Sequence, residues 1–196
     1  MTENQNIEYK QSWHDDYLKW VCGFANSLGG KIFIGIDDNG KVTGLDNYRV
    51  LMEDIPNKIK NLMGIICDVN LLDEDGKKYI EIIVPRYTVP ISLRGRFYYR
   101  SGSVKQELTG PSLNEFLLKK SGLTWDEVTE PRASLADIDE PTVRKFIKDC
   151  AKAKRIDIEE NITIAQILDK LHLRNEGQLK RAAIILFRKE PAKFFN

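Results

Sequence analysis

The spacing of apolar residues in the first part of the chain changes at a pair of glycines. Between residues 17 and 28 apolar positions recur every three or four residues, which predicts a helix with one apolar face. Gly29 and Gly30 then supply the positive φ that a helix C-terminus commonly needs. Residues 32–36 form a β-branched, nearly continuous apolar run, as expected of a strand buried on both faces. This order predicts a helix, a glycine turn and a central strand.

Further strand-like and helix-like segments surround this centre. The predicted strands cover residues 6–11, 41–45, 68–72, 78–84 and 96–100, with 41–45 as the second arm of a hairpin through Asn39-Gly40. Helices are predicted over residues 48–63 and 112–120, and Pro56 would kink the first or divide it into two segments. The mixture predicts an α/β fold, with a mixed sheet and flanking helices in two or three layers.

The sequence changes character at Gly122. Residues 123–135 are mostly polar and contain Pro131, which is typical of a linker. Helices are predicted over residues 139–154, 163–171 and 179–189. We therefore expect one domain over residues 1–122. Residues 123–196 are predicted to be a linker and a mainly helical segment that begins a truncated second domain.

Positive and negative charges balance along the chain. There are 30 basic and 29 acidic residues in total, and 16 of each before Gly122. This balance excludes a global field that attracts nucleic acid, so a nucleic-acid surface must be a local patch. The three cysteines are widely spaced and no histidines cluster near them, which disfavours a zinc site or a disulfide framework. No signal peptide or membrane-spanning run is present, and we expect a cytoplasmic protein.

Carboxylates at strand positions are the first candidate chemical feature. Glu8 and Lys10 would share one face of the first strand, and Asp37 and Asp38 follow the buried strand. Carboxylate oxygens on converging strands suit Mg²⁺ or Mn²⁺, and Lys10 would meet a phosphate. The alternative interpretation is a solvated strand edge and a turn.

A basic and aromatic segment is the second candidate. The predicted nucleic-acid contacts are Lys10, Arg94, Arg96, Tyr98, Arg100 and Lys105. Arg96, Tyr98 and Arg100 would share one exposed face of the strand, with Phe97 and Tyr99 on the other face. Arginines beside an aromatic ring form a surface for phosphate contact and base stacking. The alternative is an exposed sheet face without a ligand.

Two other patterns concern phosphates. Residues 25–32 come near a P-loop, but Ala25 and Ile32 replace its first glycine and its Ser/Thr, so ATP binding is not expected. A row of basic residues lines the helix predicted over residues 139–154 and its end: Lys145, Lys148, Lys152, Lys154 and Arg155. This row is either a solvated helix face or a docking surface for a phosphate backbone.

Several motifs in residues 1–122 resemble the Schlafen-type AlbA_2 domain. They are Glu8-Tyr9-Lys10, Phe24-Ala25-Asn26-Ser27-Leu28-Gly29-Gly30, the run from Ile34 to Leu45, and Tyr99-Arg100-Ser101-Gly102-Ser103. Residues 182–191 are similar to the region that follows this domain in bacterial transcriptional regulators and RecG-like helicases, where the chain continues further. The resemblance implies the nucleic-acid-binding module of a transcriptional regulator, with DNA and RNA both open as partners.

In the Schlafen branch the resemblance also implies a metal-dependent endoribonuclease. Its catalytic residues would be Glu3, Glu8, Lys10 and Asp38, and the three carboxylates would hold Mg²⁺ or Mn²⁺. A nucleic-acid-binding module is thus the first predicted function, a ribonuclease the second and a protein-interaction scaffold the third. We also expect a homodimer, because the chain carries one copy of a motif set that the RNA-cutting relatives use in two lobes.

Overall fold

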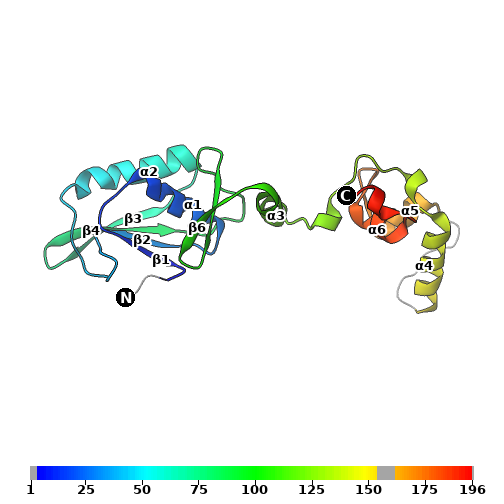
Figure 1. Cartoon of the computed structure of the whole chain (residues 1–196), viewed down its shortest axis with the longest axis horizontal. Coiled ribbons are helices and arrows are strands. Elements are labelled where there is room, and N and C mark those ends of the chain that lie inside the picture. The colour runs from blue at the N-terminus through cyan, green and yellow to red at the C-terminus, as the bar shows by residue number, and fades with distance from the viewer. Residues whose placement is uncertain (1–3, 154–161, 196) are drawn as a thin grey trace. The chain divides into compact units, whose positions relative to one another are not determined.

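The computed structural model describes residues 4–153 and 162–195. The chain divides into two compact units, Met1–Ser121 and Gly122–Asn196 (Figure 1). In the first unit, four strands form a mixed sheet in the order β1-β2-β4-β3. They are β1 (Ile7–Lys10), β2 (Gly30–Ile34), β3 (Asp68–Glu74) and β4 (Lys77–Val84). Only β1 and β2 pair in parallel among them, and the predicted α/β class is confirmed.

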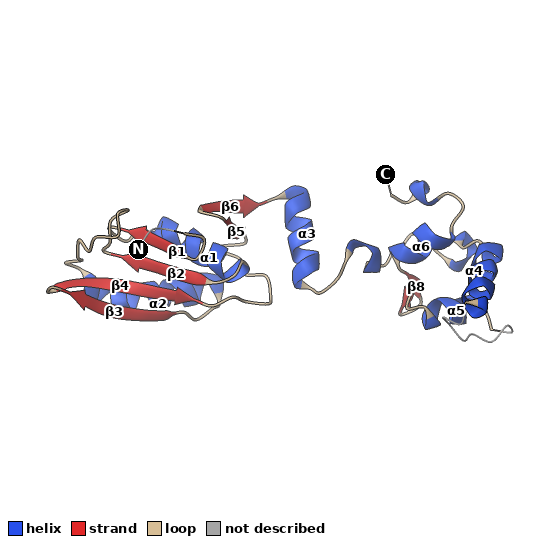
Figure 2. Ribbon diagram, turned by 90° about the horizontal axis from the view of Figure 1, so that it is seen from below, coloured by secondary structure: helices blue, strands red, loops and turns tan. Residues whose placement is uncertain are grey.

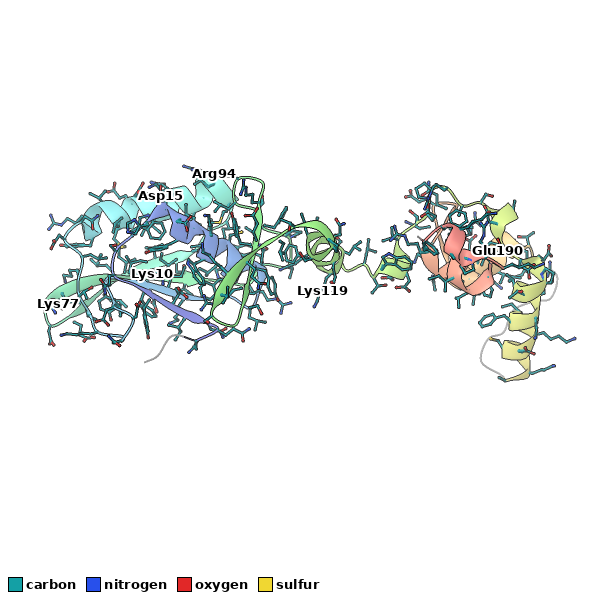
Figure 3. All side chains as sticks on the ribbon, in the orientation of Figure 1. Lys10, Asp15, Lys77, Arg94, Lys119 and Glu190 are labelled. Carbon is teal, nitrogen blue, oxygen red and sulfur yellow. The ribbon has the colours of Figure 1, made fainter. Side chains whose placement is uncertain are left out.

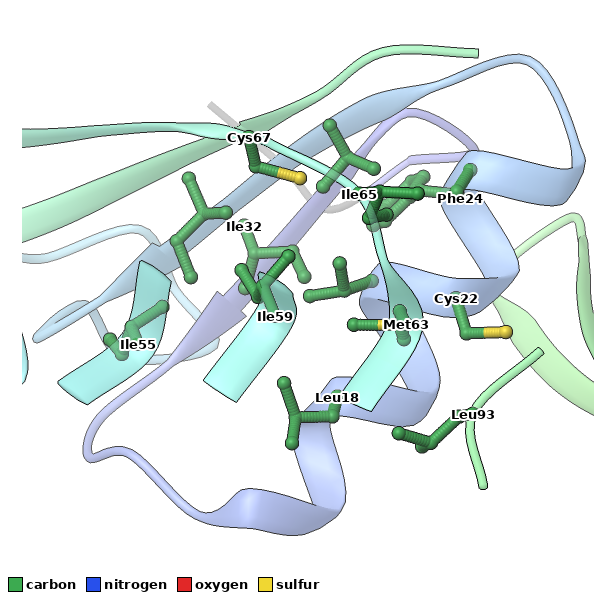
Figure 4. Close-up of a cluster of buried hydrophobic side chains, with 14 of the residues drawn as sticks. Leu18, Cys22, Phe24, Ile32, Ile55, Ile59, Met63, Ile65, Cys67 and Leu93 are labelled. Carbon is green, nitrogen blue, oxygen red and sulfur yellow. The ribbon is translucent and has the colours of Figure 1, made fainter. Parts of the chain in front are cut away.

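Two helices cover one face of this sheet (Figure 2). Helix α1 (Leu18–Asn26) connects the parallel strands β1 and β2, and α2 (Tyr48–Met63) follows β2. The side chains of Phe24, Ile32 and Ile55 are fully buried in the core between the helices and the sheet (Figure 4). Burial of each such side chain contributes about 1.5–3 kcal/mol to folding. The apolar residues that the sequence places on the helices and on the strands therefore pack in one core.

The glycine turn has two separate physical causes. Gly29 has a φ of 78°, in the left-handed region that favours glycine. Gly30 begins β2, where an added Cβ would lie 2.2 Å from Cε1 of Phe24. Gly29 is therefore required by backbone conformation, and Gly30 by the close approach of the Phe24 ring.

Three expectations for this unit need correction. Residues 41–45 form no strand, and the expected hairpin arm is reduced to a single bridge between Ile36 and Val42. Helix α2 is one continuous element that contains Pro56, so the proline does not divide it into two segments. A hairpin of β5 (Phe97–Ser101) and β6 (Val104–Leu108) packs on α1, and its second strand was not predicted. Helix α3 (Gly110–Lys120) follows the hairpin.

The second unit is mainly helical. Its longer elements are α4 (Glu140–Lys152), α5 (Ile164–Lys170) and α6 (Arg181–Phe187), with an unpredicted hairpin of β7 (Arg174–Asn175) and β8 (Gln178–Leu179) between the last two. Its own core contains Val143, Leu168 and Phe187. Within the described residues of the chain, no helix is both long and apolar enough to cross a membrane.

Candidate nucleic-acid interface

A buried ion network joins β1 to β5. The Glu8 carboxylate is 3% exposed and accepts from Arg100 Nη1 through Oε2 at 2.7 Å. Its Oε1 lies 2.6 Å from Nζ of Lys10, so Glu8 and Lys10 share a face as predicted. Both carboxylate oxygens are thus held by cations, as a buried charge requires.

Arg100 is enclosed by backbone and aromatic groups. Its guanidinium donates to the carbonyl oxygens of Gln5 and Asn4, at 2.9 and 2.8 Å. The guanidinium carbon lies 4.7 Å from the ring centroids of both Trp20 and Phe24 on α1. Each guanidinium nitrogen of this buried cation thus donates to an acceptor inside the first unit, and the network fixes the N-terminal segment against the β5–β6 hairpin.

The predicted orientation of the basic strand is therefore wrong. Tyr98 is 6% exposed and Arg100 is 1% exposed, because this face of β5 packs against α1. The half-buried rings of Phe97 and Tyr99 lie on the other face, each with its centroid 6.2 Å from that of Phe116 on α3. Two of the predicted nucleic-acid contacts are thus buried.

Arg94 and Arg96 lie in a tight turn before β5. Leu93 and Arg96 exchange two backbone hydrogen bonds, of 2.8 and 3.0 Å. The two residues between them, Arg94 and Gly95, have φ angles of 50° and 78°. Positive φ at both central positions is the geometry of a type I′ turn, where Asn or Gly is usual. Arg94 is therefore held, exposed, in a conformation that is costly for an arginine.

One side chain fixes both ends of the segment that carries this turn. Asn26, at the end of α1, is 2% exposed. Its Nδ2 donates to the carbonyl oxygens of Ile91 and Tyr98, each at 2.8 Å. Its Oδ1 accepts from the amide of Ile91 at 2.9 Å. The turn of residues 93–96, called the arginine turn below, is thereby anchored to the core of the first unit.

The turn borders a pocket of about 640 Å³. The other walls come from the start of α1, the short 3-10 helix before it and the β5–β6 hairpin. Its lining residues are Asp15, Asp16, Leu18, Lys19, Leu93, Arg94, Arg96, Tyr98, Lys105 and Glu107. Figure 3 shows Arg94 and Asp15 in the same region of the first unit. The fold thus gathers four cations and three carboxylates around one hollow.

Most of the pocket's charges are already paired. Hydrogen bonds from Lys19 and Lys105 lower the pKa of the Asp16 carboxyl, and a hydrogen bond from Lys58 lowers that of Asp15. Arg96 Nη1 lies 3.4 Å from Oε2 of Glu107, with the arginine side chain 67% exposed. Arg94 has no ion-pair partner among the residues that the structure describes. It is the cation best placed to meet an external anion.

The structure describes two of the three predicted metal ligands, Glu8 on β1 and Asp38 in the turn that follows Ile36. Glu8 pairs with Ile32 in the parallel register, whereas Asp38 is exposed in the turn after Ile36. Glu3 lies outside the described residues. Among residues 4–153 and 162–195, no group of three His, Cys, Asp or Glu side chains could hold a metal ion. Glu8 itself fits a metal poorly, since both its oxygens face cations.

The comparisons with known proteins decide the family. The Schlafen, AlbA_2 family model matches residues 3–109. The chain belongs to this family. A search of curated proteins gave no match. Among solved structures, the DIP2311 protein from Corynebacterium diphtheriae is 20% identical with a TM-score of 0.49, and the match covers 94% of this chain and 41% of that one.

A second solved structure is the N-terminal domain of a RecG-related protein from Nitrosomonas europaea. It is 21% identical with a TM-score of 0.37, and the match covers 54% of this chain and 82% of that one. The present chain thus spans less than half of the Corynebacterium protein. The family assignment rests on the sequence match over residues 3–109.

Sequence reasoning found part of the pocket. Arg94, Arg96, Tyr98 and Lys105 were singled out, and all four line it. Lys19 and the Asp15-Asp16 pair were missed, because they precede or begin the predicted helix and have no special spacing. Asn26 was also missed as an anchor. A polar residue among the apolar positions of α1 is the signal that would have revealed it.

Proposed function

We propose that the first unit binds nucleic acid and that the arginine turn contacts its phosphates. The observation that carries this proposal is the exposed, left-handed Arg94 at the edge of a pocket with three other cations. Strained backbone is retained where function requires it, and arginine is well suited to bidentate phosphate contact. The family assignment supports the same class of partner, because the AlbA_2 resemblance implies nucleic acid.

The pocket carries little net charge, but its cations differ in how strongly they are paired. The cations that are weakly paired or lack a described ion-pair partner are the ones that a phosphate would bind. A phosphate that approaches Arg94 meets a cation with no described ion-pair partner. The next cation, Arg96, forms an exposed ion pair with Glu107. Exposed ion pairs contribute little free energy, so a phosphate readily displaces the Glu107 carboxylate from Arg96. Binding of this kind is sensitive to salt, because it releases counterions from the nucleic acid.

Charge reversal at the turn tests the proposal. We expect the Arg94→Glu/Arg96→Glu variant to bind labelled single-stranded and duplex DNA and RNA at least about tenfold more weakly at 100 mM salt. The slope of log affinity against log salt should fall by about 2, because two phosphate contacts are lost. Fluorescence anisotropy over a salt series measures both quantities.

Two further variants control this experiment. Lys119→Glu changes an exposed lysine on α3, away from Arg94 in Figure 3, and should leave affinity near that of the wild type. Arg94→Asn removes the charge but suits the left-handed backbone, so it should raise the thermal midpoint while it weakens binding. Equal affinity of the charge-reversal and Lys119 variants, or no binding by the wild type even at low salt, would refute the proposal.

The remaining predictions of function lack a supporting observation in the described residues. The predicted metal-dependent cleavage of RNA needs a metal site, and Glu8 is engaged by Arg100 and Lys10. A role as a transcriptional regulator, or as a protein-interaction scaffold, likewise stays a prediction from the sequence. The exposed cations around the pocket support nucleic-acid binding as the first of these functions.

A two-fold homodimer also stays a prediction. A dimer would double the cations available to one ligand, which a single near-neutral unit needs for a groove. Light scattering at micromolar concentration should give twice the chain mass of 22.6 kDa. A mass equal to one chain at all concentrations tested would exclude the dimer.

A further inference from the structure

A basic stripe runs along α4 in the second unit. Val143 and Ile147 are the residues of this helix that are buried in the unit's core. With 3.6 residues per turn, four cations fall within an arc of about 100° on the side away from that core. They are Arg144, Lys145, Lys148 and Lys152, all exposed, and no acidic residue lies within the arc.

Ion pairs are seen at the two ends of this stripe. Arg144 pairs with Glu140 at 2.8 Å, and Lys152 lies 3.9 Å from Asp149. Lys145 and Lys148 have no ion-pair partner among residues 4–153 and 162–195. Lys154 and Arg155, which continue the row in the sequence, lie outside the described residues. Among the described residues, the centre of the stripe thus presents positive charge without an acidic partner.

The spacing of these cations opposes helix stability. Lys148 is four residues from both Arg144 and Lys152, and three residues from Lys145. Like charges at these separations destabilise a helix, because the side chains are neighbours on its surface. A bound polyanion would relieve this repulsion. The stripe therefore has a physical cost that a solvated helix face with mixed charges would avoid.

The geometry favours a nucleic-acid backbone over a membrane. The stripe is about 12 Å long, which corresponds to three or four phosphates along one strand of duplex DNA. A helix that lies on a membrane must insert its apolar face, but Val143 and Ile147 are packed inside the second unit. Lysines act as point charges without bidentate geometry, which suits sequence-independent contact.

We infer that the α4 stripe is a second nucleic-acid contact, independent of the arginine turn, and that it binds the phosphate backbone without base specificity. The proposed contact extends binding to the second unit of the chain. Two separate sites on one chain raise the overall affinity through effective concentration when both engage the same ligand.

A charge-reversal pair in the full chain tests this inference. We expect Lys145→Glu/Lys148→Glu to weaken binding to a labelled 20-base-pair DNA duplex by about tenfold at 100 mM salt, and to lower the salt slope by about 2. The matched control is Lys170→Glu/Lys193→Glu, which makes the same change in net charge at two exposed lysines of the same unit. The control pair should bind within about twofold of the wild type, since only the general field is altered.

A single substitution supplies an independent readout. Lys148→Glu turns three like-charge neighbours into opposite-charge neighbours, so it should raise the thermal midpoint by about 3 °C while it weakens DNA binding. Equal affinity of the stripe and control pairs would overturn the inference. So would stripe-dependent binding to vesicles of anionic lipid without any effect on DNA. Loss of binding in the Arg94→Glu/Arg96→Glu variant alone would uphold the proposed function and reject the α4 contact.

Discussion

Replacement of Arg100 by Met is expected to lower the free energy of unfolding by about 3–5 kcal/mol. The substitution leaves the Glu8 carboxylate buried with Lys10 as its one remaining described cation. It also removes the donors that serve the carbonyl oxygens of Gln5 and Asn4. Methionine keeps most of the buried volume, so the loss reports the charge and its hydrogen bonds. Urea unfolding followed by circular dichroism measures the effect.

Two comparisons make this result specific. Arg96→Met removes an exposed ion pair from the same segment and should leave the unfolding free energy almost unchanged. The double variant Glu8→Gln/Arg100→Met should be more stable than the sum of the single effects predicts. Each single substitution leaves one charge of the buried Glu8–Arg100 pair without the other, and the double variant removes both charges of that pair. Additive effects, or a loss at Arg100 no larger than that at Arg96, would contradict the network described here.

The fold class and the central elements could be predicted from the sequence because each has a local cause. The periodicity of residues 48–63 gives α2 with both its ends, even though Pro56 lies inside it. The φ of Gly29 follows from the helix C-terminus that precedes it. These features depend on neighbours within one or two turns, which a single sequence displays.

The candidate site was predicted only in part because it depends on contacts distant in the sequence. Alternation along residues 96–100 shows which side chains share a face, but not which face is buried. That choice is made by α1, whose Trp20 and Phe24 rings accept the Arg100 guanidinium. An arginine pattern usually indicates an exposed surface, and here a partner 92 positions away makes burial favourable. The distant partner is Glu8, which the strand pattern and the resemblance had placed in a metal site.

Asn26 is the residue that connects the core to the proposed binding turn, and Asn26→Ala is expected to lower the free energy of unfolding by about 3 kcal/mol. The substitution leaves the amide and carbonyl of Ile91 and the carbonyl of Tyr98 buried without the partner that Asn26 provides. An unpaired buried backbone group costs about 1–3 kcal/mol, and relaxation of the segment recovers part of the sum. Chemical denaturation measures the loss, and Ser27→Ala is the neighbouring control because its hydroxyl makes only a long bond of 3.4 Å.

The same substitution should also weaken nucleic-acid binding under conditions where the protein remains folded. Ile91 and Tyr98 flank the turn that holds Arg94 in its left-handed conformation. Release of both ends lets that turn adopt other conformations, so only a fraction of the molecules is competent to bind. The apparent affinity falls in proportion to that fraction. Anisotropy at a temperature well below the midpoint of the variant separates this effect from unfolding. A variant with wild-type affinity and a stability loss below about 1 kcal/mol would show that Asn26 does not anchor the turn.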